Sequence, residues 1–234
     1  MKKTLVLFDI DGTLLLTLGA GVRGMNTAFG RLHGRSDALD GLAIAGRTDR
    51  SIVGDAFARI DVDATPERIA TLRDAYFEDL RVELANTAGE RFGVLPGVLA
   101  AIDALDRRDD VAVGLLTGNF VGGAEIKLGR FDLWRRFEFG AFGDDHLDRR
   151  DLVPVARAAA AARGIDPGAI VVIGDTPLDI DCAHAHGAAA VAVATGPYRT
   201  DELRPADLVV ETLEALSPDW LSKVIVKRDG RARS

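Results

Sequence analysis

The chain opens on an uninterrupted apolar run that delivers two carboxylates. Residues Leu5–Leu14 read LVLFDIDGTL, so four apolar residues lead directly to Asp9, and Gly12 follows Asp11. A short continuous apolar run that ends in turn residues predicts a strand buried on both faces. Because alternate side chains of a strand share a face, we expect Asp9 and Asp11 side by side where the strand ends. Two adjacent like charges require a cation or a shared proton.

From Pro96 onward the hydrophobic pattern alternates between helical and strand periodicity. Helices are predicted near 98–107, 121–131, 152–163 and 177–186, and strands at 111–116, 169–173, 188–194 and 207–210. Alternating strands and helices are typical of an open, doubly wound parallel sheet, and therefore of an α/β fold of the Rossmann-like kind. In such a sheet, ligands bind outside the C-terminal ends of the strands.

The segment 16–90 has a different character. It contains helical patterns at 51–60 and 66–84 and no strong strand run. We therefore predict an all-α domain inserted into an α/β core that comprises residues 1–15 and 91–222.

The last residues, 223–234, form a third predicted region. They carry Lys223, Lys227 and three arginines against a single aspartate, and Gly230 interrupts any helix. This composition predicts a basic, flexible tail with a frayed end.

Composition narrows the classes of function. The 234 residues are 47% hydrophobic, with a net charge of −7 and a pI near 5.1. An acidic body argues against nucleic-acid and membrane-surface binding, because both depend on clustered Lys and Arg. The apolar start is cut short by Asp9, so it predicts a strand and not a signal peptide or membrane span. A single cysteine, Cys182, fits a reducing cytoplasm, where we expect a monomer or homodimer.

Polar residues follow two more of the predicted strands. Thr117, Gly118 and Asn119 come directly after the strand 111–116. The Thr117 hydroxyl and the next backbone N–H groups can bind phosphate oxygens at a helix N-terminus. The alternative is that Thr117 or Asn119 caps the helix.

The segment Gly174–Asp179 follows the strand 169–173. Asp175 and Asp179 can face one site if the helix begins at Pro177, and Thr176 is a suitable N-cap for that start. Thr176 and Asp179 also form a Thr-x-x-Asp pattern, so Asp179 could instead complete a capping box.

The three segments resemble the motifs of the haloacid dehalogenase-like hydrolase superfamily, which are Asp-x-Asp-Gly-Thr, a Thr or Ser after a strand, and Gly-Asp-x-x-x-Asp. The resemblance implies that Asp9 attacks a phosphoryl group and becomes a transient aspartyl-phosphate. It implies that Asp11 protonates the departing oxygen and then activates water. A carboxylate attacks phosphorus usefully when it is held in line and a metal neutralises the phosphate oxygens.

The same resemblance implies a Mg²⁺ site. Its ligands would be Asp9, the backbone carbonyl of Asp11, and Asp175, with Asp179 as a further candidate. Contact with the cation would keep Asp9 ionised, while the nearby anionic groups would favour a proton on Asp11. Thr117, Gly118 and Asn119 would bind the phosphate.

The family's remaining motif is a lone Lys or Arg beside the phosphate, commonly Lys followed by Pro. This sequence departs from that pattern, because no lysine lies between Lys127 and Lys223. We predict that Arg149 supplies the charge, with Arg150 and Lys127 as alternatives. For Arg150, solvated surface charge is the better interpretation.

In family terms the inserted segment resembles a small helical cap that closes over the site. Its predicted specificity loop is Ala45–Asp49, in which Arg47 can engage an anionic or hydroxylated substrate. Plain helix capping with a solvated Arg47 is the alternative, and Arg23 is a weaker candidate. The segment has no lysine, which argues against a phosphonate-cleaving relative that needs a Schiff-base lysine.

Two patterns point elsewhere. Gly19–Gly24 matches Gly-x-Gly-x-x-Gly, the signature of nucleotide-dependent oxidoreductases, but it does not close the first strand as that signature should. Cys182, His184 and His186 resemble a soft-metal cluster, yet His184 would point away from the others on a helix.

The sequence therefore predicts a Mg²⁺-dependent phosphatase of a small phosphorylated metabolite, such as a phosphoglycolate-like compound or a sugar phosphate. The alternatives are a phosphomutase of the same superfamily and, more distantly, a non-catalytic binding protein or an oxidoreductase. A dehalogenase is disfavoured, because that branch lacks the second aspartate of the first motif.

Overall fold

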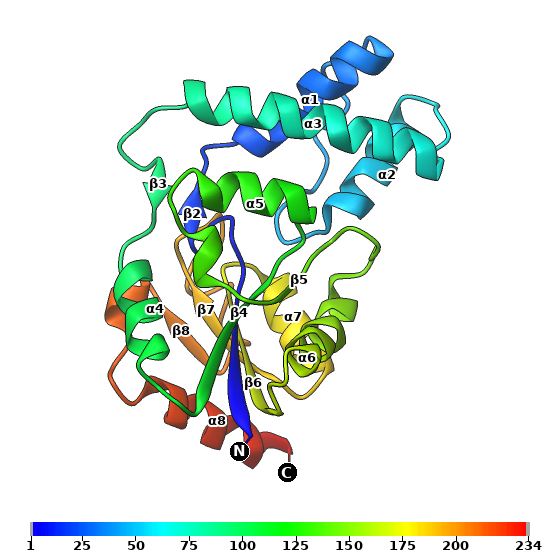
Figure 1. Ribbon diagram of the computed structural model, residues 1–234. Helices are drawn as coiled ribbons and strands as arrows, with labels where there is room; N and C mark the ends of the chain where they lie inside the picture. The colour runs from blue at the N-terminus through cyan, green and yellow to red at the C-terminus, as the bar shows by residue number, and fades with distance from the viewer. Residues whose placement is uncertain (1, 233–234) are drawn as a thin grey trace.

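A computed structural model describes residues 2–232 of the chain. Its centre is a six-stranded sheet in the order β5-β4-β1-β6-β7-β8, and every neighbouring pair is parallel. The strands are β1 (Lys3–Phe8), β4 (Val111–Leu116), β5 (Gly140–Ala141), β6 (Pro167–Gly174), β7 (Ala189–Val193) and β8 (Leu208–Val210). Figure 1 shows helices on both sides of this sheet, so the predicted doubly wound α/β fold is confirmed.

The apolar run of β1 is buried on both faces, as its composition predicts. Leu5 and Leu7 pack in the cluster that includes α6 (Leu152–Ala162) and α7 (Pro177–Ala185). Val6 and Phe8 pack in the opposite cluster. That cluster includes residues of α4 (Val98–Asp106), α5 (Val121–Gly129) and α8 (Trp220–Ala232). These four side chains are 0% exposed, so β1 is fully buried up to the residue before Asp9.

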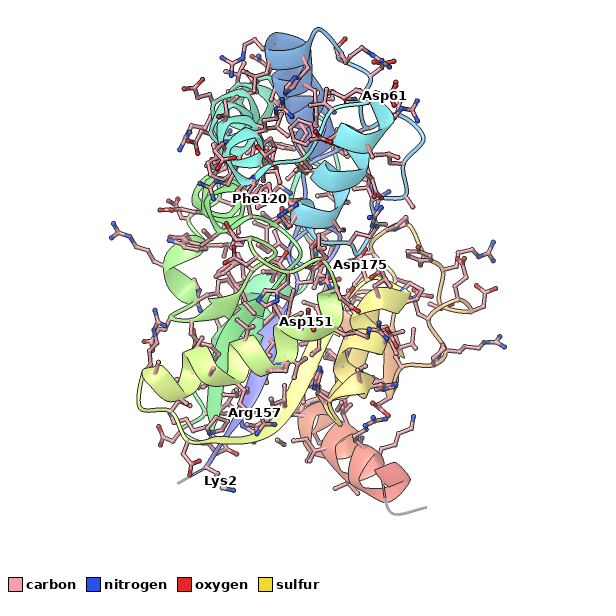
Figure 2. The ribbon with its side chains drawn as sticks, turned by 90° about the vertical axis from the view of Figure 1, so that its right-hand side faces the viewer. Lys2, Asp61, Phe120, Asp151, Arg157 and Asp175 are labelled. Atoms are coloured by element: carbon pink, nitrogen blue, oxygen red, sulfur yellow. The ribbon has the colours of Figure 1, made fainter. Side chains whose placement is uncertain are left out.

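A helical cap covers the C-terminal edge of the sheet (Figure 1). It consists of α1 (Ala20–His33), α2 (Asp49–Arg59) and α3 (Pro66–Asn86), which share their own apolar cluster. Phe120, which precedes α5 of the core, is 1% exposed inside that cap cluster. Figure 2 shows Phe120 and Asp175 at the level where cap and core meet. The three helices thus lie over the edge of the sheet at which folds of this kind bind ligands.

The sequence pattern missed the shortest strands. An antiparallel ribbon of β2 (Leu15–Leu16) and β3 (Gly93–Val94) joins the cap to the core. This ribbon and β5 are two residues long per strand, which is too short for any periodicity to register.

The C-terminal segment differs from the expected frayed tail. Residues 223–232 belong to α8, which passes through Gly230 without a break, so that prediction is corrected for them. Leu221 and Val224 are 2% exposed against the sheet cluster, and the Lys227 ammonium donates to the backbone oxygen of Asp207 at 2.5 Å. Tertiary burial therefore offsets the low helix propensity of glycine. Residues 233 and 234 lie outside the described residues.

Among residues 2–232, no helix combines the length and the apolar character that crossing a membrane requires.

Candidate active site

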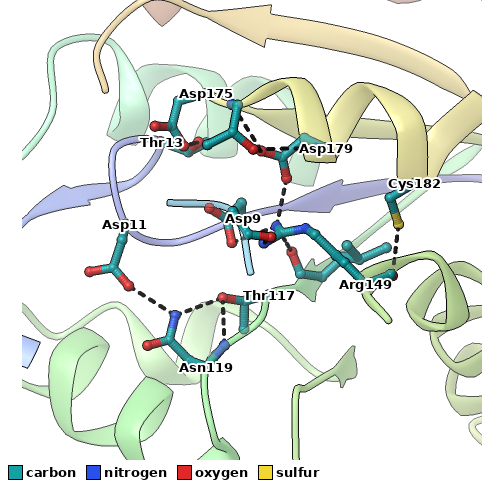
Figure 3. A network of polar contacts seen from close by, with 12 residues as sticks. Asp9, Asp11, Thr13, Thr117, Asn119, Arg149, Asp175, Asp179 and Cys182 are labelled. Carbon is teal, nitrogen blue, oxygen red and sulfur yellow. Dashed lines mark hydrogen bonds and ion pairs between the residues drawn. The ribbon is translucent and has the colours of Figure 1, made fainter. Parts of the chain in front are cut away.

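Three loops converge where β1, β4 and β6 end, directly beneath the cap. They bring Asp9, Thr117 and Asp175 to the same edge of the sheet (Figure 3). The Thr13 hydroxyl donates a hydrogen bond to Asp175 Oδ1 at 3.2 Å, which ties the first and third loops together. A cavity of about 550 Å³ lies between this edge and the cap.

Asp9, Asp175 and Asp179 form a buried carboxylate cluster. One oxygen of each lies within 4.8 Å of the others, and none of the three residues is more than 4% exposed. Burial raises the pKa of Asp9 to about 6, against the attraction of Arg149. Burial and the neighbouring Asp179 also raise the pKa of Asp175 well above its ordinary value. Three hard oxygen donors around an excess of negative charge fit a divalent cation such as Mg²⁺.

Arg149 is the cation at the base of this cluster. Its Nη2 lies 2.9 Å from Asp9 Oδ1 and 2.6 Å from Asp179 Oδ1, and its Nη1 donates to the Gly46 oxygen at 2.9 Å. Burial disfavours the charge, but the two carboxylates outweigh that cost and hold the Arg149 pKa above its usual range. Its neighbour Arg150 is exposed and pairs with Asp148, so the interpretation of Arg150 as surface charge fits the structure.

Asp179 serves two structural purposes at once. It completes a capping box with Thr176 at the start of α7, and it accepts a hydrogen bond from Arg149. The two interpretations of Asp179 therefore do not exclude each other. Gly174 makes this possible, since a Cβ there would lie 2.0 Å from the Asp179 carboxyl carbon.

Asp11 does not lie beside Asp9 in the way the strand pattern predicts. β1 ends at Phe8, and the chain then turns on Gly12, which has φ +82°. Figure 3 shows the Asp11 carboxylate directed at Asn119, away from Asp9. Because β1 ends before Asp9, the alternation of side chains along a strand does not place Asp9 and Asp11 on one face.

The expected proton on Asp11 is also wrong for this geometry. The Lys127 ammonium lies 2.5 Å from Asp11 Oδ2, and the Asn119 amide donates to the same oxygen at 2.9 Å. Burial opposes the charge of Asp11, but Lys127 together with the hydrogen bonds from Asn119 and Thr17 outweighs it and lowers the pKa of Asp11 below its ordinary value. We expected Lys127 only as an alternative cation beside the phosphate, because no local pattern relates residues 116 positions apart.

The loop after β4 is buried and internally hydrogen-bonded. The Thr117 hydroxyl accepts from the Asn119 side-chain amide at 2.8 Å, and Asn119 Oδ1 accepts from Lys127 at 2.6 Å. Phe120 is the N-cap of α5 and makes no side-chain cap. The alternative that Thr117 or Asn119 caps the helix is therefore wrong.

The cap contributes one buried acid that sequence reasoning did not place in the site. The backbone N–H of Asp49 donates to the Gly118 oxygen at 2.6 Å, and Asp49 Oδ2 accepts from the backbone N–H of Phe120 at 2.8 Å. Burial raises the pKa of Asp49 to about 7, although Lys127 opposes the shift. The helix-capping role belongs to Thr48, whose side chain accepts from Ser51.

Arg47 lines the cavity, as its predicted loop requires, but its charge is engaged. Its Nη2 lies 2.7 Å from Asp55 Oδ2, and its Nη1 donates to the Ala43 oxygen. The weaker candidate, Arg23, pairs with Glu83 within the cap.

The two rival patterns are not assembled into sites. Gly19 is the N-cap of α1, inside the entry to the cap. Cys182 donates to the Arg149 backbone oxygen, His184 contacts Asp207, and His186 contacts the Arg150 backbone oxygen. Each therefore has a separate structural partner.

Sequence comparison decides the family. A profile of haloacid dehalogenase-like hydrolases matches residues 6–184, which is most of the chain. The chain belongs to the haloacid dehalogenase-like hydrolase family. Family members with which it shares sequence include phosphoglycolate phosphatases of Pseudomonas putida (28% identity, 92% of this chain and 78% of the relative) and Rhodospirillum rubrum (26% identity, 92% and 90%). These relatives indicate a phosphatase, so the predicted enzyme class is confirmed.

Solved structures agree on the fold. CbbY from Rhodobacter sphaeroides in complex with phosphate superposes with a TM-score of 0.70 at 18% identity, over 96% of this chain and 99% of CbbY. A mutant of CbbY was solved with xylulose-1,5-bisphosphate. The β-phosphoglucomutase of Clostridium difficile also reaches 0.70, at 14% identity over 100% of both chains.

Proposed function

We propose that the protein is a Mg²⁺-dependent phosphatase that hydrolyses a small phosphorylated metabolite through an aspartyl-phosphate on Asp9. The observation that carries the proposal is the placement of Asp9. Its carboxylate is buried, lines the cavity beneath the cap, lies 2.9 Å from Arg149, and shares a three-carboxylate cluster. A nucleophile, a cation and a set of hard ligands therefore meet at one point of the cavity.

The ligands of Mg²⁺ would be Asp9, the backbone carbonyl of Asp11, Asp175 and Asp179. When bound, the ion supplies positive charge to the phosphate oxygens and to the carboxylates. The cluster fits this role because it holds three carboxylates and one guanidinium, and is short of positive charge.

Asp9 attacks phosphorus while Arg149 stabilises the charge of the phosphate. The Thr117 hydroxyl and the backbone N–H groups of Gly118 and Asn119 hold the remaining oxygens. With a pKa of about 6, Asp9 is largely ionised at neutral pH and so is ready as a nucleophile.

Asp11 acts as the general acid and the general base of the proposed reaction. Paired with Lys127 it is ionised, which is the form that accepts a proton from water when the aspartyl-phosphate is hydrolysed. To protonate the departing oxygen in the first step, it must carry a proton. The proton that Asp11 takes from water in the second step restores this form for the next turnover, and the bound substrate has to weaken the pairing with Lys127 so that Asp11 keeps the proton.

Arg47 remains the proposed specificity residue of the cap, which requires the substrate to compete with Asp55 for its guanidinium. The proposed location is the cytoplasm, because the single cysteine of the sequence is buried and free. The proposed oligomeric state is a monomer or a homodimer.

The test is phosphate release from a panel of phosphate monoesters, with phosphoglycolate and sugar phosphates included, in Mg²⁺ and in chelator. The Asp9→Asn variant keeps the shape of the side chain and loses the nucleophile, so turnover should fall about a thousandfold or more. Asp109→Asn, at an exposed loop, is the matched control and should retain full activity. Turnover that survives Asp9→Asn or needs no divalent metal contradicts the proposal.

A phosphomutase is the second candidate, favoured by the β-phosphoglucomutase fold match. It predicts conversion of one sugar-phosphate isomer into another with no net release of phosphate, which ³¹P NMR of the same reactions would detect.

A further inference from the structure

The cavity has two chemically different faces. The core provides a polar floor, which includes Asp9, Thr117 and Asn119. The cap provides a roof in which five apolar side chains face the same space, namely Val22, Met25, Leu39, Ile44 and Ile52. Met25, Leu39 and Ile52 are at most 4% exposed, while Val22 and Ile44 are half-buried. The roof is therefore a built apolar surface, continuous with the core of the cap.

Three of the four cationic side chains that line the cavity, among residues 2–232, are paired with carboxylates. Arg149 is held by Asp9 and Asp179, Lys127 by Asp11, and Arg47 by Asp55. Within residues 2–232, the lining cation without a carboxylate partner is Arg91, which is exposed and contacts the Thr195 backbone oxygen at 3.5 Å.

Several carboxyl groups line the cavity as well. Besides the carboxylate cluster, Asp11 and Asp49 line the same cavity. A carboxylate or a second phosphate on the substrate would thus lose its water next to acidic groups and apolar carbons. Both effects oppose its binding.

The cavity is also larger than the smallest candidate substrates need. At the roughly 30 Å³ that a water molecule occupies in the liquid, 550 Å³ has room for about eighteen heavy atoms. Phosphoglycolate has about half that number. A larger substrate could therefore reach the roof residues, which line the same cavity.

We propose that the substrate is the phosphate monoester of an uncharged, largely apolar alcohol, whose hydrocarbon part packs against Val22, Ile44 and Ile52. This inference rests on the proposed phosphatase function, since the phosphate is placed at Asp9. It selects against phosphoglycolate and highly hydroxylated sugar phosphates as the preferred substrates. It also replaces the proposed specificity role of Arg47, because an apolar substrate would leave the Arg47–Asp55 pair intact.

The first test is a series of alkyl phosphates from ethyl to hexyl phosphate, whose leaving alcohols are chemically alike. Burial under the roof should raise kcat/KM about threefold to fourfold per methylene. Isobutyl phosphate has the heavy-atom shape of phosphoglycolate without the charge, and it should be turned over at least tenfold more efficiently. A flat series, together with phosphoglycolate as the better substrate, would overturn the inference and leave the phosphatase proposal intact.

A matched pair of variants locates the effect. Val22→Thr keeps the shape of a half-buried roof residue and adds a hydroxyl, so it should lower the hexyl-to-ethyl ratio of kcat/KM at least threefold. Val82→Thr makes the same change on α3 at a side chain that is 57% exposed, and should leave the ratio unchanged. Equal ratios in all three proteins would exclude the roof as the cause.

A binding measurement decides the inference without turnover. Alkylphosphonates are not hydrolysed, and their affinity for the wild-type protein can be followed by calorimetry in Mg²⁺. Hexylphosphonate should bind at least thirtyfold more tightly than ethylphosphonate, and phosphonoacetate more weakly than isobutylphosphonate. If these rankings hold while no phosphate is released from any ester, the preference of the cavity for an apolar ligand stands and the phosphatase proposal fails. If the rankings are reversed, the inference fails whatever the activity.

Discussion

Replacement of Lys127 by methionine tests the most unexpected contact of the site. Lys127 is 4% exposed, and its ammonium lies 2.5 Å from Asp11 Oδ2 and 2.6 Å from Asn119 Oδ1. Methionine fills similar space but donates no hydrogen bond. The variant therefore leaves one partly buried carboxylate without its cation and one buried amide oxygen without its donor.

The expected cost follows from how far each group is buried. Loss of one partner of a fully buried ion pair costs about 3–5 kcal/mol, and an exposed pair contributes about 0.2–1 kcal/mol. The Lys127 side chain is 6% exposed and that of Asp11 is 40% exposed, so this pair lies between the two cases. With the unpaired Asn119 oxygen included, Lys127→Met should lower the free energy of unfolding by about 2–3 kcal/mol.

A double-mutant cycle separates the ion pair from packing. In an Asp11→Asn background, Lys127 is a buried cation without the carboxylate it is paired with, so Lys127→Met should cost about 1 kcal/mol or less. The coupling free energy is then about 2 kcal/mol, measured by urea unfolding of the four proteins in chelator. The exposed pair Lys223 and Asp219 is the control cycle, and its coupling should be about 0.3–0.5 kcal/mol. A Lys127 coupling no larger than that of the control would refute the reasoning.

Three further outcomes are expected. Arg149→Met leaves Asp9 and Asp179 buried without their guanidinium. Urea unfolding at pH 8 should therefore show a free energy of unfolding lower by about 3–5 kcal/mol. A decrease below about 1 kcal/mol would contradict the ion-pair geometry. The pKa of Asp49 is raised from 3.8 to about 7, so the folded state binds this proton more tightly than the unfolded state does. The resulting stabilisation is complete below about pH 4 and is lost as the pH rises to about 7. Asp49→Asn cannot titrate, so its stability relative to wild type should increase between pH 4 and 8 in unfolding experiments; a constant difference would argue against the shift. Gly118→Ala places a Cβ 2.0 Å from the Arg47 backbone oxygen, so it should prevent the cap from packing against the core. We expect kcat/KM to fall at least tenfold while the circular dichroism spectrum is unchanged. Kinetics equal to those of the wild type would show that this contact is not needed for catalysis.

Much of the fold was predictable from local pattern because the sheet is buried on both faces. Strands such as β4 read as continuous apolar runs, and α7 begins at the Thr176 and Pro177 that signal a helix start. The two-residue strands were not predictable, and neither was α8, because tertiary packing and not local propensity stabilises them.

Some features of the candidate site were likewise predictable from local sequence, and others depend on tertiary packing. The sequence by itself determined which chemistry reaches the edge of the sheet, because Asp9, Thr117 and Asp175 each follow a recognisable buried strand. It also indicated an arginine near residue 149 as the cation, from the absence of lysine in that part of the chain.

Only the tertiary structure decided how those groups are charged and what surrounds them. The pairing of Asp11 with Lys127, the burial of Asp49 against Phe120, and the apolar roof all join residues that are distant along the chain. The physical reason is that pKa values and apolar burial depend on the atoms within a few ångströms, and sequence order determines those neighbours only within a single helix or strand.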